Sequence, residues 1–181
     1  MASCKLNRNI LRNTSCGYSL LEINDIYLAN YDDFTTSALT DSAGCESVTA
    51  VTTATTGASF YHIVPAKNSV TFTDELVVED SGAKYRTHTI TFSISNRYDS
   101  CLHADFDNLS LGRFLAVVKT ADGNYLMLGR LTGLEASAAT LSGGGDTNGM
   151  EITLSANVAE SAMPLSDGAV AAMLALVPVQ E

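Results

Sequence analysis

Apolar and polar residues alternate along several short stretches of the chain with the period of a half-buried β-strand. Residues 150–155, Met-Glu-Ile-Thr-Leu-Ser, alternate strictly. Further stretches rich in β-branched, aromatic and aliphatic residues are also predicted to be strands, namely 20–28, 48–56 and 60–64. The pattern indicates a mainly β protein.

Two longer patterns predict antiparallel hairpins, because each joins two strand-like stretches through a turn that contains glycine, at Gly82 or at Asp122-Gly123. The first hairpin pairs residues 69–78 with 84–96, and the second pairs 114–119 with 125–131. The second is continuously apolar, so both of its faces must be covered. We expect a neighbouring copy to supply one of the two covers, through Phe114 and Val117.

One helix is predicted over residues 99–112, where Leu102, Phe106 and Leu109 recur at helical spacing before Gly112. The fold class expected is an antiparallel β-sandwich or barrel with one α-helix and a long protruding hairpin. With 181 residues, 46% of them hydrophobic and 17% charged, the chain has enough apolar material for one folded domain. The predicted division is an N-terminal arm (1–15), a β domain (16–167) and an apolar C-terminal segment (168–181).

Parity separates the two faces of the first hairpin, because side chains alternate across a strand. The odd-numbered face carries hydroxyls and acids without Lys or Arg, and includes Thr71, Thr73, Glu75, Thr87, Thr89, Thr91 and Ser93. An ordinary solvated sheet face is one explanation. The alternative is a wall past which a polyanion slides, since fixed cations would bind its phosphates.

The charge of the chain is negative and unevenly distributed. Ten bases against twenty acids give a formal charge of −10, which argues against tight capture of nucleic acid. Lys5, Arg8 and Arg12 make the N-terminal arm basic, whereas residues 13–66 hold six acids and no base. The arm is either a solvated terminus or a segment that docks on the acidic body of another copy.

The even-numbered face of the first hairpin becomes basic toward its tip, at Lys84, Arg86 and His88. We expect this tip to contact an acidic neighbouring subunit. No apolar run approaches the length of a membrane span, and no signal-peptide-like stretch precedes the first strand, so a cytoplasm-like compartment without membrane contact is expected.

Motifs of common catalytic and cofactor sites are not found in the sequence: there is no P-loop, dinucleotide fingerprint, nucleophile elbow or zinc-protease motif. The four cysteines include no Cys-x-x-Cys pair, and Asp105 and Asp107 lack the spacing of a calcium loop. The prediction is a protein that is not an enzyme and that holds no metal or cofactor.

Several segments resemble tail tube and related virion proteins of bacteriophages that infect Bacteroidetes-type hosts. The segments that carry the resemblance are 16–18, 23–31, 60–63 leading into the first hairpin, 122–129, 132–136 and 148–154. The resemblance implies a β-sandwich with one helix, assembled into stacked hexameric rings whose long hairpins line a lumen for double-stranded DNA.

This family would place the protein in the virion, assembled in the host cytoplasm and in contact with other tail proteins. The C-terminal segment 168–179 departs from the family pattern and is expected to be a strand or a contact between rings. A head–tail connector or capsid-decorating protein, and a soluble β-sandwich binding module, remain as alternatives.

Overall fold

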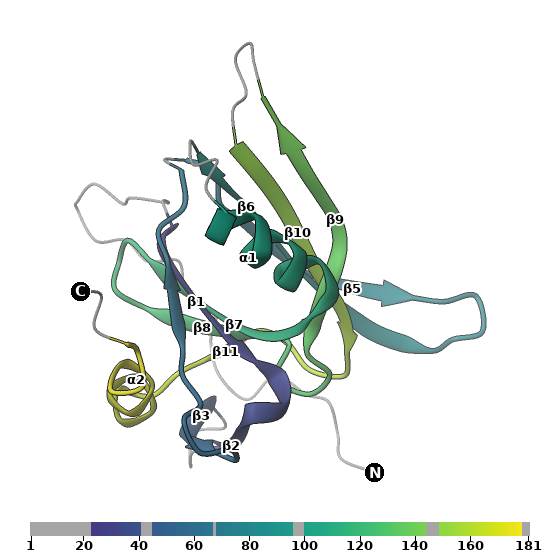
Figure 1. Ribbon diagram of the computed structural model, residues 1–181. Coiled ribbons are helices and arrows are strands. Elements are labelled where there is room, and N and C mark those ends of the chain that lie inside the picture. The colour runs from purple at the N-terminus through teal and green to yellow at the C-terminus, as the bar shows by residue number, and fades with distance from the viewer. Residues whose placement is uncertain (1–22, 41–44, 67, 96–99, 144–148, 179–181) are drawn as a thin grey trace, which may run out of the picture.

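The computed structural model describes residues 23–40, 45–66, 68–95, 100–143 and 149–178, which form a mainly β fold of antiparallel strands (Figure 1). The strands are β1 (Ile23–Asn30), β2 (Phe34–Thr40), β3 (Glu46–Thr53), β4 (Tyr61–Ile63), β5 (Thr71–Val78), β6 (Lys84–Ser95), β7 (Arg113–Thr120), β8 (Tyr125–Leu128), β9 (Leu134–Ser142), β10 (Gly149–Val158) and β11 (Met163–Pro164). The helices are η1 (Tyr31–Asp33), α1 (Ser100–Leu111) and α2 (Asp167–Leu174).

Nine of the described strands form one sheet in the order β11-β8-β7-β9-β10-β6-β5, with β1 paired to β7 and to β4. β2 and β3 form a separate two-stranded sheet. The mainly β antiparallel fold expected from the sequence is confirmed. β2 and β9 had not been predicted as strands, since both are rich in Ser, Thr and Ala rather than in large apolar residues.

Strands β1 and β7 lie at the centre of the molecule and are buried on both faces. Their even-numbered residues, such as Ile26 and Ala116, belong to one core cluster with Ile90, Phe92 and Ile152 from β6 and β10. Helix α1 packs against this first cluster through Phe106 and Leu109. Period-two alternation sends the odd-numbered residues of β1 and β7 into a second cluster.

The second cluster is completed by the chain itself. Leu115 and Val117 of β7 meet side chains of the small sheet, such as Val48, and of α2, such as Met173. The continuous apolar pattern correctly indicated two covered faces, but the second cover is intramolecular. The expectation that a neighbouring copy covers Phe114 and Val117 is therefore corrected, because both residues are buried within one subunit.

Both predicted hairpins are present, as β5–β6 and β7–β8. Gly82 and Gly123 have positive φ angles of 84° and 85°, a conformation that glycine adopts without steric cost. The Gly82 N–H donates to the Glu79 carbonyl over 2.8 Å and closes the first turn. In Figure 1, the β5–β6 hairpin extends away from the body of the molecule.

The structure contains two α-helices in its described part, one more than expected. The predicted helix is confirmed as α1. The first part of segment 168–179 is not a strand but belongs to α2, whose Ser166 side chain caps the Ala169 N–H at 3.4 Å, and its contact between rings stays a prediction. Alanine is the strongest helix former and serine is a preferred N-cap, which favours this outcome. Ala169 and Met173, one turn apart, are the buried residues of α2.

Replacing Met173 with alanine should lower the free energy of unfolding by about 2–5 kcal/mol, because the loss of its buried side chain leaves a cavity. Leu174 is the matched control, since it is the next residue and is 40% exposed. Leu174→Ala should cost about 1 kcal/mol or less. Urea denaturation of dilute protein measures the stability of both variants. If Met173→Ala lowered the stability only at high protein concentration and not in dilute solution, a second copy rather than the chain itself would cover the second core cluster.

Candidate functional surface

The odd-numbered residues within 71–75 of β5, 87–93 of β6 and 151–157 of β10 form one continuous polar surface, here called the polar wall. Strand pairing places Thr71 opposite Thr91 and Thr73 opposite Thr89, and β10 extends these rows. The polar wall consists of Thr71, Thr73, Glu75, Thr87, Thr89, Thr91, Ser93, Glu151, Thr153, Ser155 and Asn157. All seven residues predicted for a lumen face therefore lie on one face of the sheet.

Hydrogen bonds between neighbouring strands join side chains of the polar wall. The Thr87 hydroxyl donates to the Asn157 amide oxygen over 3.0 Å, and the hydroxyls of Thr91 and Thr153 lie 3.0 Å apart. All residues of the wall are exposed or half-buried. Such cross-strand pairs stabilise the sheet and keep the hydroxyl groups in the plane of the surface.

The polar wall has no cation. The pairing register places Glu75 and Glu151 on it, and no Lys or Arg falls on this face within Thr71–Glu75, Thr87–Ser93 or Glu151–Asn157. The wall can therefore form hydrogen bonds with water, while its fixed charge is negative. A phosphate backbone would find no guanidinium or ammonium group on it to bind.

Arg86 lies on the opposite face of the hairpin and is paired within its own chain. Its Nε atom is 2.5 Å from Oδ1 of Asp74, and its Nη2 atom donates a hydrogen bond to the Asp74 carbonyl. This guanidinium therefore holds β5 against β6 within one subunit, and its contact with a neighbouring subunit stays a prediction. Lys84 is exposed at the tip and forms no ion pair within the described part of the chain.

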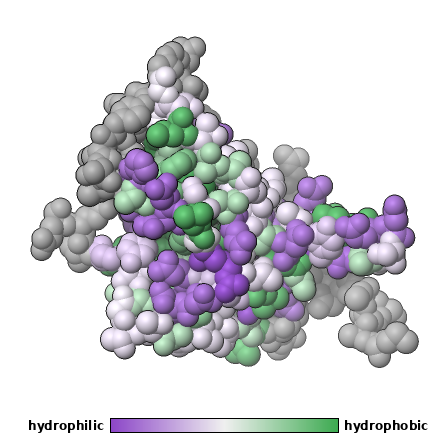
Figure 2. All heavy atoms as spheres, turned by 45° about the vertical axis from the view of Figure 1, so that its right-hand side comes forward, coloured by the Kyte–Doolittle hydropathy of each residue, from purple (hydrophilic) through white to green (hydrophobic). Residues whose placement is uncertain are grey.

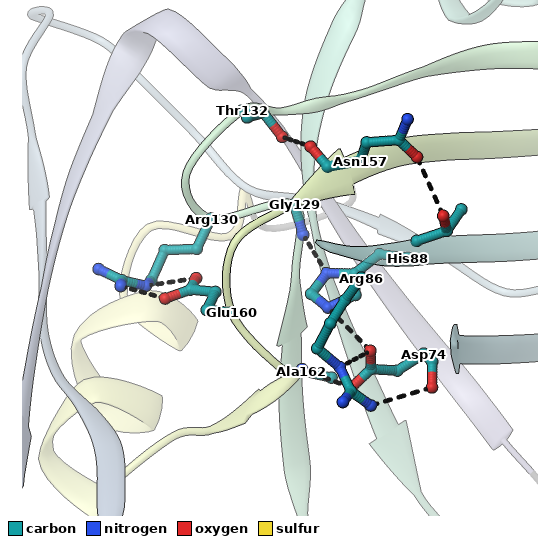
Figure 3. Close-up of polar contacts among 10 residues, drawn as sticks. Asp74, Arg86, His88, Gly129, Arg130, Thr132, Asn157, Glu160 and Ala162 are labelled. Atoms are coloured by element: carbon teal, nitrogen blue, oxygen red, sulfur yellow. Dashed lines mark hydrogen bonds and ion pairs between the residues drawn. The ribbon is translucent and has the colours of Figure 1, made fainter. Parts of the chain in front are cut away.

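Asp74 connects the base of the hairpin to a segment far along the sequence (Figure 3). Its second carboxylate oxygen accepts a hydrogen bond of 2.9 Å from the Ala162 N–H. Burial acts to raise the pKa of Asp74, but the hydrogen bonds from Arg86 and Ala162 outweigh it and hold this pKa below its usual 3.8. The side chain is thus an ionised anchor for the hairpin.

His88 is 1% exposed and lies beside this anchor. Its Nδ1 accepts a hydrogen bond of 3.2 Å from the Gly129 N–H, which places the ring proton on Nε2. Nε2 faces Oδ1 of Asp74 at 3.4 Å. Burial lowers the pKa of His88 below 6.5, although Asp74 and Glu160 act to raise it, so the ring is neutral at pH 7.

Residues 129–132 and 157–162, which contact the base of the hairpin, carry a further ion pair. The Arg130 guanidinium forms two hydrogen bonds with the Glu160 carboxylate, and the Thr132 hydroxyl donates to the Asn157 carbonyl (Figure 3). The sequence analysis did not identify these residues or Asp74. The available signal was Asp74 itself, a lone acid in the apolar even-numbered stripe of β5.

The other residues predicted to contact a neighbouring subunit lie in the N-terminal arm and in the core. Lys5, Arg8 and Arg12 lie outside the described residues. Phe114 and Val117 lie in the two core clusters. Among the described residues no group of three or more His, Cys, Asp and Glu side chains has an arrangement suited to a metal ion, and no described helix is both long and apolar enough to span a membrane.

Comparisons of the chain with protein-family models, with curated proteins and with solved structures found no match.

Acidification should destabilise the protein through His88. Because its folded pKa is lowered, the unfolded chain takes up a proton below about pH 6.5 that the folded chain does not bind, so stability is lost as the pH falls. Asp74 contributes in the same direction only below about pH 4. His88→Asn keeps an acceptor for the Gly129 N–H and removes the titration. Urea midpoints measured at about pH 7.5 and about pH 5.5 should fall less in this variant than in the wild type; equal falls would contradict the prediction.

Proposed function

We propose that this protein is a structural virion protein that self-assembles into stacked rings and forms a tail tube for the passage of double-stranded DNA. The polar wall is the observation that carries the proposal. The resemblance of the sequence to tail tube proteins supports it, and so does the mainly β fold with a projecting hairpin.

The chemistry of the polar wall suits a surface along which DNA moves without being held. Double-stranded DNA carries about one negative charge per 1.7 Å of its axis, and proteins bind it by placing Lys and Arg against the phosphates. Hydroxyl groups such as those of Thr73 and Thr89 carry no positive charge that would hold the phosphates by ionic attraction. The carboxylates of Glu75 and Glu151 repel the phosphates.

The proposed assembly takes place in the host cytoplasm, and the proposed partners are further copies of the chain and other tail proteins. Purified protein should form rings or tubes as its concentration rises, visible by negative-stain microscopy and mass photometry. A head–tail connector would give single closed rings that do not stack. A protein that remains a 19.1 kDa monomer at every concentration would be a soluble binding module, and the tube proposal would fail.

Placing cations on the polar wall should slow DNA passage. Thr73 and Thr89 lie directly opposite each other, so Thr73→Lys combined with Thr89→Lys creates a pair of positive charges on the wall. Virions that carry this variant should eject DNA more slowly than the wild type, most of all at low salt, where charge screening is weak.

Thr73→Gln with Thr89→Gln is the matched control, because it enlarges both side chains without adding charge. Both variants should assemble normally, as both positions are accessible to solvent. Ejection at the wild-type rate from virions that demonstrably contain the lysine variant would remove the polar wall from the lumen.

A further inference from the structure

An apolar groove of about 740 Å³ lies between the base of β5, the β7–β8 turn and helix α2. Its apolar lining includes Phe72, Leu126, Val170 and Leu174, and Leu174 is 40% exposed. The charged residues in this lining are Asp122 and Asp167, both exposed and without an ion pair in the described part of the chain. The groove thus combines an apolar floor with a negative rim.

The tip of the β5–β6 hairpin has the complementary composition on its even-numbered face. Leu76 is 53% exposed and Val78 is 57% exposed, and Lys84 lies directly opposite Val78 on the same face. On the other face, Tyr85 donates a hydrogen bond of 2.8 Å to Glu79, which keeps this acid away from Lys84. Figure 2 shows hydrophobic residues among hydrophilic ones on the projecting part of the molecule.

The tip cannot fold back into the groove of its own subunit. Phe72, which lines the groove, and Leu76 lie on one continuous strand and on the same face of it. Between them, Asp74 ties this strand to Arg86 and to the Ala162 N–H. Because the strand is held straight in this way, each residue toward the tip lies about 3.3 Å further from the groove than the one before it. Within the described part of the chain this apolar pair is uncovered, and a second copy can cover it.

We propose that the hairpin tip of one copy docks in the groove of a second copy. Leu76 and Val78 enter the apolar floor, and the Lys84 ammonium group approaches the carboxylate of Asp122. The inference rests on the self-assembly part of the proposed function and names its interface. Because tip and groove are different surfaces of the same chain, repeated docking generates rings or stacks of copies.

Charge reversal on the two surfaces tests the pairing. Lys84→Glu places a carboxylate opposite that of Asp122, and Asp122→Lys places an ammonium group opposite that of Lys84, so each variant alone should need at least about tenfold more protein to assemble. In an equimolar mixture the residue at position 84 of each variant finds an opposite charge at position 122 of the other variant. The mixture should therefore assemble at nearly the wild-type concentration, as measured by sedimentation and mass photometry.

Apolar contacts are tested with a control matched in exposure. Leu76→Gln in the tip and Leu174→Gln in the groove should each weaken assembly. Leu141, which is 54% exposed, is the control because it belongs to neither surface, and Leu141→Gln should leave assembly unchanged. Urea midpoints of dilute protein should stay close to the wild-type value in all three, because none of these side chains is buried.

The remaining outcomes overturn the inference. If the wild type assembles and the tip and groove variants assemble equally well, or if mixing the two charge variants does not restore assembly, the tip does not dock in the groove, while the tube proposal stands. Loss of assembly only after Lys5, Arg8 and Arg12 are replaced by Gln would identify the N-terminal arm as the occupant. A wild type that never assembles overturns this inference together with the proposed tube.

Discussion

Burial of β1 and β7 on both faces is the constraint on which the rest of the structure depends. A strand with one apolar face needs one cover, but Ile26 and Tyr27, or Ala116 and Val117, point to opposite sides and are all buried. The large sheet with α1 covers one side, and the small sheet with α2 covers the other. Because a single chain supplies both covers, the subunit has its core before any copy meets another, and the surfaces left for assembly are the projecting ones.

The Asp74 anchor determines how the first hairpin projects. Phe72 and Ile90 fix its base in the first core cluster, but beyond them the hairpin leaves the body, and a two-stranded ribbon in water is only marginally stable. Asp74 lies at this exit and binds both Arg86 of the partner strand and the Ala162 N–H. The anchor therefore stabilises the ribbon where hydrophobic packing ends, and it does so with a half-buried ion pair rather than with more apolar surface.

Local sequence patterns predicted many of the strands and one of the helices, but they did not predict contacts between residues far apart in the sequence. The hairpin turns at Gly82 and Gly123, the helix α1 and the two-faced burial of β7 all follow from spacing within about fifteen residues. The contact of Asp74 with Ala162 spans 88 positions, and no periodicity signals it. The pairing of Arg86 with Asp74, which lies diagonally across the ribbon, was not predicted either. Helix α2 was missed because an apolar, alanine-rich run does not distinguish a strand from a buried helix.

The register of β5 against β6 links the core, the anchor and the polar wall. A slip of β5 by one residue would move Phe72 out of the core, and a slip of β6 would bring Lys84 and Arg86 onto the wall, since side chains alternate with a period of two. Burial of Ile90 and Phe92 opposes that slip through hydrophobic packing, and the pairing of Arg86 with Asp74 opposes it through charge. The absence of cations from the wall, on a hairpin that carries Lys84 and Arg86, is thus a property of the register. Whatever stabilises the hairpin base also keeps positive charge off the polar wall.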